Sequence, residues 1–231
     1  MSVSLTYSLI LPCLNEEENI EATVWDAAHW LSTEKLDGTI IVVNDGSTDG
    51  TAAILEKLQR ELTNLQVVTH PKKSGYGLAV RSGCDAAATD IIAFMDSDGQ
   101  FKAKELSLLL PSMQTYAFVT GRRRYRADPF MRRVFGKILG LMNFLFFGIW
   151  IRDVNCGLKM FTREVWPRIR PTHAVEKLFN TEMFIRLKRQ KILWLAVPVP
   201  HYPRLHGKPT GGSPSVILLM FKELWDLKRL L

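Results

Sequence analysis

The sequence predicts an α/β fold in which a mostly parallel sheet carries helices on both faces. Short apolar runs alternate with helical patterns through the first half of the chain, without an internal repeat or an obvious linker. This alternation is typical of parallel sheets, because a helix supplies the crossover that two parallel strands need. The 231 residues, 47% of them hydrophobic, can bury one full core, so we expect a single domain over residues 1–231.

Five apolar runs are the expected strands, and each of the first four is followed by a helical pattern. The runs cover 3–12, 39–45, 65–70, 91–96 and 116–121. The helical patterns cover 15–33, 48–62, a stretch that begins near the glycines of 74–77, and 103–113. Asn15 is the expected N-cap of the first helix, because acids follow it in the first turn, and Ser47 or Asp49 is the expected cap of the second.

The cysteines and the N-terminus indicate the compartment. Three scattered cysteines without C-x-x-C spacing predict neither a disulfide framework nor a zinc site, which fits a reducing cytoplasm. The N-terminal residues run from a short apolar stretch straight into acids, an order that argues against a signal peptide. We therefore expect a cytoplasmic protein.

The positive charge is concentrated in one short segment. The formal net charge is +7, and residues 122–137 contain seven basic residues and one acid. The rest of the chain is close to neutral, which predicts one basic patch rather than a general affinity for polyanions. We therefore expect no nucleic-acid partner.

A long uncharged run follows the basic segment. As a helix, residues 138–151 would span about 21 Å at about 1.5 Å per residue, less than the roughly 30 Å hydrocarbon core of a bilayer. The run is either a buried core helix or a helix at the membrane surface, and we expect an amphipathic, membrane-facing or acceptor-side helix over about 129–151. A second amphipathic helix, expected over about 214–231, packs on the core or contacts lipid.

Four polar residues and one glycine stand where the expected strands end. They are Asn15, Asp45, His70, Asp96 and Gly121. Parallel strands bring their carboxyl ends to one edge of a sheet, and ligands of open α/β sheets bind at that edge. The sequence therefore predicts a candidate active site there.

The acid pair Asp96 and Asp98 is the most informative of these features. Gly99 allows a tight turn after the fourth strand, so that both carboxylates can face a hard divalent ion. Mg²⁺ typically takes one or two protein carboxylates and keeps positions for substrate phosphates, which predicts that the site handles a diphosphate. The alternative is a simple turn in which Asp98 accepts a hydrogen bond from its own backbone.

Six segments, in order, resemble family 2 glycosyltransferases with the GT-A fold, and among these the dolichyl- or polyprenyl-phosphate sugar transferases. They are ILPCLNEEENI, IIVVNDGSTDGT, KSGYGLAVRSG, FMDSDGQF, DVNCGLKMF and VPVPHYPRLHGKPTGG, and the resemblance spans about residues 5 to 212. It implies a Rossmann-like sheet, a nucleoside-diphosphate sugar donor and Mg²⁺ or Mn²⁺. It also implies an inverting transfer of the sugar to a polyprenyl phosphate, dolichyl or undecaprenyl, by a peripheral protein on the inner face of the membrane.

The resemblance assigns roles to individual residues. Donor binding is implied for Pro12, Asn15, Glu16, Asp45, Lys73, Asp96 and Arg204. Metal binding is implied for Asp96 and Asp98 with Gln100, and binding of the acceptor phosphate for Arg123 and Arg132. Plainer interpretations stay open: Pro12 and Asn15 as strand end and helix cap, Asp45 as a turn acid, and Lys73 and Arg204 as solvated charges. His70 stands where an arginine is common.

The acceptor decides whether the reaction needs a general base. A metal held by Asp96 and Asp98 would stabilise the charge that develops on the leaving diphosphate. A lipid phosphate is already anionic, whereas a sugar hydroxyl would have to lose a proton. Asp153 and Glu182 are the candidates for orienting the acceptor or taking that proton. Asp153 could instead end the apolar helix, and Glu182 could be a buried or helix-surface acid.

Two other classes of function remain open. A metal-dependent glycosyltransferase with a soluble saccharide, protein or small-molecule acceptor would depend strongly on Asp153 or Glu182. A non-enzymatic basic module that binds membranes or nucleic acid would explain the basic segment, but not the carboxylates at the strand ends.

Overall fold

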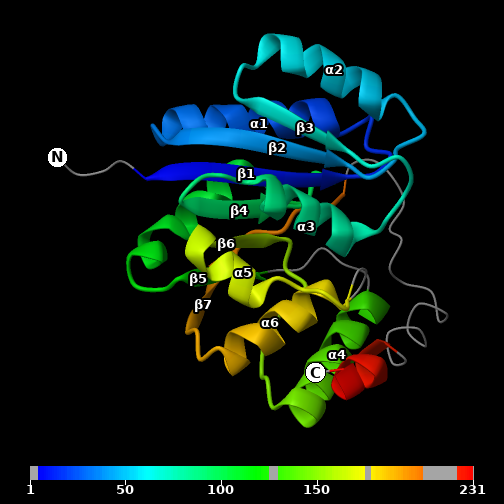
Figure 1. Ribbon diagram of the computed structural model, residues 1–231, viewed down its shortest axis with the longest axis vertical. Coiled ribbons are helices and arrows are strands. Elements are labelled where there is room, and N and C mark those ends of the chain that lie inside the picture. Colours follow the sequence, from blue (N-terminus) through cyan, green and yellow to red (C-terminus); the bar gives the residue numbers. More distant parts are fainter. Residues whose placement is uncertain (1–4, 125–129, 175–177, 205–222, 231) are drawn as a thin grey trace.

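The computed structural model describes residues 5–124, 130–174, 178–204 and 223–230 (Figure 1). Its centre is a seven-stranded sheet with the order β3-β2-β1-β4-β6-β5-β7. The strands are β1 (Thr6–Cys13), β2 (Asp37–Asn44), β3 (Leu65–Thr69), β4 (Ile91–Met95), β5 (Phe118–Arg123), β6 (Leu158–Thr162) and β7 (Trp194–Val199). All five expected strands are therefore present.

The sheet is mostly parallel, as expected, but one strand runs the other way. β1 pairs in parallel with β2 and β4, β2 with β3, and β5 with β7. β6 is antiparallel to both of its neighbours, β4 and β5. No strand was predicted at Leu158–Thr162; β6 inserts between β4 and β5, which both precede it in the chain.

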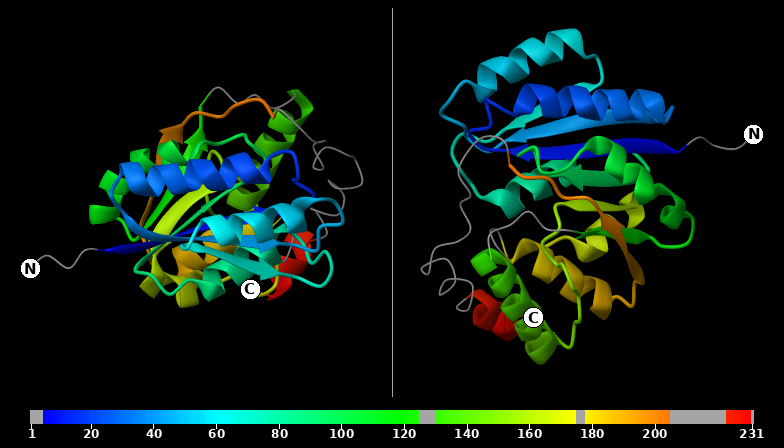
Figure 2. Two further views of the ribbon diagram at one scale, coloured as in Figure 1. Left: turned by 90° about the horizontal axis from the view of Figure 1, so that it is seen from above. Right: turned by 180° about the vertical axis from the view of Figure 1, so that it is seen from behind.

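Helices cover both faces of the sheet. They are α1 (Ile20–Thr33), α2 (Thr51–Glu61), α3 (Tyr76–Ala86), α4 (Phe130–Phe147), α5 (Trp166–Ile169), α6 (Phe179–Arg189), the short 3-10 helices η1 (Ala103–Leu108), η2 (Leu110–Gln114) and η3 (Arg163–Val165), and a helix at 223–230. One core cluster packs α1, α2 and η1 on the sheet, and the other packs α3 to α6 on the opposite face (Figures 1 and 2). Neighbouring strand residues such as Leu9 and Ile10 point into different clusters, as the two-residue period of a strand requires.

Three helix predictions were wrong in detail. The first helix begins at Ile20, and Asn15 is not its N-cap but a residue in the left-handed region, with φ 54°. The second begins at Thr51 after Gly50, so neither Ser47 nor Asp49 is its N-cap. Residues 103–113 form η1 and η2 instead of one α-helix, because Pro111 lacks the N–H that a continuous helix would use.

The apolar run at 138–151 is only partly helical. α4 ends at Phe147, Gly148 reverses the chain with φ 62°, and Ile149 and Ile151 are buried in the core. Among the described residues, none of the helices is both long and apolar enough to cross a bilayer. The expected helix at 214–231 lies outside the described residues except for 223–230, which pack on α4 through Trp225 and Phe146.

Candidate active site

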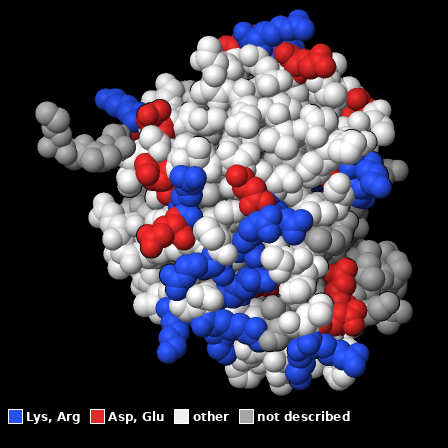
Figure 3. Space-filling view, viewed as in Figure 1, with Lys and Arg blue, Asp and Glu red and all other residues white. Residues whose placement is uncertain are grey.

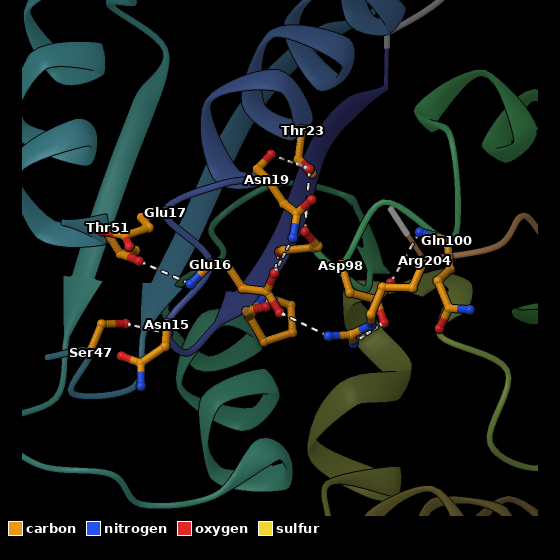
Figure 4. Close-up of polar contacts among 12 residues, drawn as sticks. Asn15, Glu16, Glu17, Asn19, Thr23, Ser47, Thr51, Asp98, Gln100 and Arg204 are labelled. Carbon is orange, nitrogen blue, oxygen red and sulfur yellow. Dashed lines mark hydrogen bonds and ion pairs between the residues drawn. The ribbon is translucent and has the colours of Figure 1, made fainter. Parts of the chain in front are cut away.

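The loops after β1 and β2 are held together by hydrogen bonds at the edge of the sheet (Figure 4). The Asn15 N–H donates to Ser47 Oγ at 3.0 Å, and the Thr48 N–H donates to Asn15 Oδ1 at 2.8 Å. Asparagine tolerates the left-handed conformation that this contact needs. The carbonyl of Pro12, at the end of β1, accepts from Ser97 Oγ at 2.9 Å and so joins the loop after β4 to the same edge.

Asp45, directly after β2, holds the loop that leads into α3. Its Oδ1 lies 2.7 Å from His70 Nδ1 and accepts the Ser74 N–H at 2.9 Å, and its Oδ2 accepts the Gly75 N–H at 2.8 Å. The other ring nitrogen of His70 lies 2.9 Å from Ser82 Oγ. Asp45 is therefore more than a turn acid, and its role in donor binding remains a prediction. Lys73 lies exposed in the same loop.

The acid pair follows β4 as expected. Asp98 Oδ1 accepts the Gln100 N–H at 3.1 Å across Gly99, whose φ is 75°, so the turn interpretation is correct for this oxygen. Asp96 Oδ1 accepts a hydrogen bond from Tyr76 Oη at 2.9 Å. Burial, and next the charge of Asp98, raise the pKa of Asp96 to about 6. Two neighbouring carboxylates, one of them costly to ionise, are a donor set that a cation would stabilise.

Gly157, directly before β6, provides the space that Asp96 occupies. A Cβ atom at this position would lie 1.9 Å from Asp96 Oδ2 and 2.2 Å from its Cγ. Any side chain here would therefore push the carboxylate away. Gly157 belongs to a segment matched to the family, but the sequence analysis assigned it no role because the contact joins residues 61 positions apart.

Arg204, in the chain after β7, contacts Asp98 of the acid pair and Glu16 (Figure 4). Its Nη2 lies 2.5 Å from Asp98 Oδ2, and its Nη1 lies 3.7 Å from Glu16 Oε1. Burial raises the pKa of Glu16. Gln100 holds the chain near Arg204 in place. Its side-chain Nε2 donates to the Tyr202 carbonyl at 3.2 Å, and its backbone carbonyl accepts the Tyr202 N–H at 3.0 Å. Arg204 is thus not a simple solvated charge.

The carboxylates at the end of β4 fit a metal ion whose remaining ligands come from a substrate. No group of three or more histidine, cysteine or acidic side chains that could hold a metal is present in the described part of the chain. The two carboxylates Asp96 and Asp98 match the number that Mg²⁺ typically takes when phosphates complete its shell. Metal binding by Gln100 remains a prediction.

Arg123 and Asp153 form a buried ion pair close to the acid pair. Asp153 Oδ2 accepts from the Arg123 N–H and from its Nε, both at 2.9 Å, and Asp153 Oδ1 accepts from its Nη2 at 2.7 Å. Asp153 lies six residues beyond the end of α4 at Phe147, so the interpretation as a helix end was wrong. The side chain of Arg132, on α4, lies outside the described residues. Gly121 lies within β5 rather than past its end.

Glu182, on α6, holds a loop. Its oxygens accept backbone N–H groups from Thr172 at 2.8 Å, His173 at 3.0 Å and Ala174 at 2.6 Å, and Arg186 Nε donates to it at 2.8 Å. Burial alone would raise the pKa of Glu182, but these donors lower it. A base role for Glu182 remains a prediction, and its visible contacts stabilise the fold.

Glu182→Gln is expected to lower the free energy of unfolding at neutral pH by about 3 kcal/mol, because an amide NH₂ would face backbone donors. The folded-state pKa is depressed, so this stabilisation is complete above the ordinary glutamate pKa and is lost as the pH falls through the folded-state value. Thermal unfolding at several pH values measures both effects, with Glu164→Gln, at an exposed position, as the control. Lost turnover with an unchanged melting temperature would instead indicate catalysis by Glu182.

The surface charge is less concentrated than expected. On the face of Figure 3, basic side chains gather where Figure 1 shows α5 and α6, which carry Arg168, Arg186, Lys188 and Arg189. This second group of basic side chains was not expected, and the basic patch predicted at 122–137 remains a prediction because the side chains of Arg126, Arg132 and Arg133 lie outside the described residues. The residues outside the basic segment can have a net charge near zero and still place their basic and acidic side chains in different regions of the surface.

This topology, with polar loops after β1, β2 and β4 and an acid pair at the end of β4, defines a GT-A-like α/β fold. Solved structures agree: glucosyl-3-phosphoglycerate synthase from Mycobacterium tuberculosis has a TM-score of 0.73 at 19% identity, covering 97% of this chain and 80% of that one. Mannosyl-3-phosphoglycerate synthase from Rubrobacter xylanophilus has a TM-score of 0.74 at 16% identity, covering 98% and 74%.

The chain belongs to glycosyl transferase family 2, whose family model matches residues 8–170. A dolichyl-phosphate beta-glucosyltransferase of Trichomonas vaginalis is 30% identical over 95% of this chain and 69% of its own length. Polyprenol monophosphomannose synthase of Mycolicibacterium smegmatis is 30% identical over 95% of this chain and 86% of its own length. The protein is thus a nucleotide-sugar-dependent glycosyltransferase, and the resemblance to lipid-phosphate sugar transferases is confirmed.

Proposed function

We propose that the protein transfers a sugar, with inversion, from a nucleoside-diphosphate sugar to a polyprenyl phosphate at the cytoplasmic face of a membrane. One observation carries the proposal. The five residues 153–157, here called the 153–157 segment, have at one end Asp153, which binds Arg123, and at the other Gly157, against which Asp96 packs. The carboxylate proposed to bind the cation and the arginine proposed to bind the acceptor phosphate are thus each in contact with one end of the same short segment, which suits the transfer of a sugar from a diphosphate to a phosphate.

The donor is bound on the β1, β2 and β4 side of this edge. Asp96 and Asp98 would hold Mg²⁺ or Mn²⁺, which when bound supplies charge stabilisation for the leaving diphosphate. Arg204, now on Asp98 and Glu16, is long enough to bind the diphosphate instead. The nucleotide is assigned to the loops with Pro12, Asn15, Glu16, Asp45 and Lys73.

The acceptor is bound on the β5 side. A phosphate monoester is anionic at neutral pH and attacks without a general base, so the protein needs only to position it and neutralise part of its charge. Arg123, which Asp153 orients, and Arg132 are assigned to this phosphate. Two relatives support this acceptor class, because one is named a dolichyl-phosphate beta-glucosyltransferase and the other a polyprenol monophosphomannose synthase.

The outer face of α4 suits a lipid surface. Its exposed apolar side chains, with those of the following turn and of 223–230, are Ile138, Leu141, Phe144, Leu145, Trp150, Trp225 and Leu230. Lys137, Lys188 and Lys228 lie among or beside them, and Lys188 donates to the carbonyls of Phe147 and Gly148, both at 2.9 Å. Apolar groups flanked by cations are typical of peripheral binding to anionic membranes.

Vesicle binding tests this surface. The double variant Leu145→Ser and Trp150→Ser removes side chains that are 64% and 66% exposed, and it is expected to weaken binding to vesicles of phosphatidylcholine and phosphatidylglycerol about tenfold or more. Vesicle sedimentation measures the affinity. Leu108→Ser, at a 47% exposed position in η1, is the matched control and should bind as the wild type does. Equal affinities for all three proteins would contradict peripheral binding through α4.

Acceptor choice tests the proposed function itself. Purified protein is incubated with UDP-glucose or GDP-mannose, with Mg²⁺ or Mn²⁺, and with either a polyprenyl phosphate in detergent or a soluble acceptor such as 3-phosphoglycerate. Metal-dependent labelling of the lipid phosphate is the expected result. Transfer only to the soluble acceptor would overturn the proposal, and so would salt-dependent RNA binding without any transfer.

A further inference from the structure

Lys159 is a buried cation to which none of the functions above gives a role. It lies on β6, opposite Phe94 of β4, and it is 0% exposed. Its Nζ lies 5.2 Å from the ring centroid of Phe94 and 5.8 Å from that of Phe184. It donates hydrogen bonds to the carbonyl oxygens of Cys156 at 2.5 Å and Val154 at 3.3 Å.

Both carbonyls belong to the 153–157 segment. Asp153 at its first position accepts hydrogen bonds from Arg123, and Asp96 occupies the space that a side chain at Gly157, its last position, would take. The ammonium of Lys159 therefore binds two inner carbonyls of the 153–157 segment, and the two ends of that segment contact the proposed acceptor and metal sites. A shift of the segment would move both sites together.

A charged side chain at this buried position has a large desolvation free energy. Burial lowers the pKa of Lys159 to about 8, although Asp96 and Asp153 act in the opposite direction. A methionine of similar length would fit between the two phenylalanine rings without this desolvation cost. Packing alone therefore does not account for a lysine here, whereas its hydrogen bonds to the two carbonyls do.

We propose that Lys159 is a positioning residue for sugar transfer, which from inside the core fixes the 153–157 segment and thereby places Asp96 for metal binding and Asp153 for its pair with Arg123. The inference rests on the proposed function, because it takes Asp96 as a metal-binding carboxylate. Lys159 touches neither substrate, and its effect is transmitted through the backbone.

The test measures Mn²⁺ affinity rather than turnover alone. Full-length wild-type and Lys159→Met proteins are titrated with Mn²⁺ in the presence of UDP or GDP, and free Mn²⁺ is followed by electron paramagnetic resonance. Circular dichroism and the melting temperature report the fold. Lys159→Met is expected to bind Mn²⁺ about tenfold or more weakly while it remains folded, which is the usual range for residues that orient metal ligands.

Two further variants separate positioning from general destabilisation. Met160→Ala empties a fully buried position on the same strand, in the core cluster on the opposite face of the sheet from Phe94 and Phe184, and it should keep the wild-type Mn²⁺ affinity even if it unfolds at a lower temperature. Lys159→Gln keeps an N–H donor on a shorter side chain and should lie between wild type and Lys159→Met. If Lys159→Met does not fold, Lys159→Gln carries the test.

The outcomes distinguish this inference from the proposed function. A wild-type protein that binds no Mn²⁺ with either nucleotide would overturn the proposed function. A wild type that binds Mn²⁺, with unchanged affinity in the folded Lys159 variant, would overturn only the inference. Equal weakening in Met160→Ala would also overturn it, because the effect would then be one of stability.

Discussion

Asp96→Asn is expected to lower the rate of sugar transfer by about a thousandfold while raising the melting temperature of the metal-free protein. Loss of one carboxylate removes about 4 kcal/mol of attraction to a cation about 4 Å away at an effective dielectric near 20, which corresponds to roughly three orders of magnitude. The pKa of Asp96 is raised to about 6, so at neutral pH the folded protein holds a charge that burial disfavours. A neutral amide removes that cost. Initial rates and thermal unfolding without metal measure the two effects.

The opposite signs of these two effects make the experiment specific. Asp37→Asn changes an exposed aspartate at the far, N-terminal end of β2, and it should leave both the rate and the stability near wild type. Chelation of divalent ions should bring the wild-type rate down to that of the Asp96 variant. Transfer that withstands both chelator and Asp96→Asn would exclude the metal-assisted mechanism.

Gly157→Ala is expected to abolish most of the activity through a single methyl group. Its Cβ would lie 1.9 Å from Asp96 Oδ2, so either the carboxylate or the 153–157 segment has to move. Because a displacement of about 1 Å at a reacting group can cost about a hundredfold, we expect at least that loss of turnover, together with weaker Mn²⁺ binding. Initial rates at saturating donor, and Mn²⁺ titration, provide the measurement.

Gly140→Ala is the matched control for this substitution. Of the residues that the structure describes, its Cβ would meet the Ile151 carbonyl oxygen alone, at an ordinary 3.6 Å, and alanine favours the helical conformation of α4. It should therefore keep full activity and gain a little stability. A Gly157→Ala enzyme as active as Gly140→Ala would show that Asp96 does not need its present position.

The sequence alone was sufficient for the first five strands and for the edge of the sheet at which the candidate site lies. Strong alternation of apolar runs and helical patterns located β1 to β5, and the parallel arrangement brought Asn15, Asp45, His70 and Asp96 to one edge. Helix starts were less predictable. Asn15 has the residue type and the following acids of an N-cap, but its side chain binds the loop after β2 instead, a contact that depends on the tertiary structure.

Gly157 and Lys159 had no predicted role, and both matter through contacts that only the folded chain makes. Gly157 matters because Asp96 occupies the space of a side chain there, and Lys159 matters because its buried ammonium donates to the carbonyls of Val154 and Cys156. The spacing of residues along the chain does not reveal such contacts. A lysine within the apolar strand β6 was the available signal, since a charge among buried residues usually has a specific partner.

The position of Arg204 implies that the metal ion and the nucleotide affect each other's binding. While its guanidinium lies on Asp98, a metal ion bound there as proposed would have to compete with it for the same oxygen. A diphosphate offers the arginine another anionic partner and so frees Asp98 for the ion. Metal and nucleotide should therefore each increase the affinity of the other by the same factor, as thermodynamic reciprocity requires, and either one alone should bind weakly.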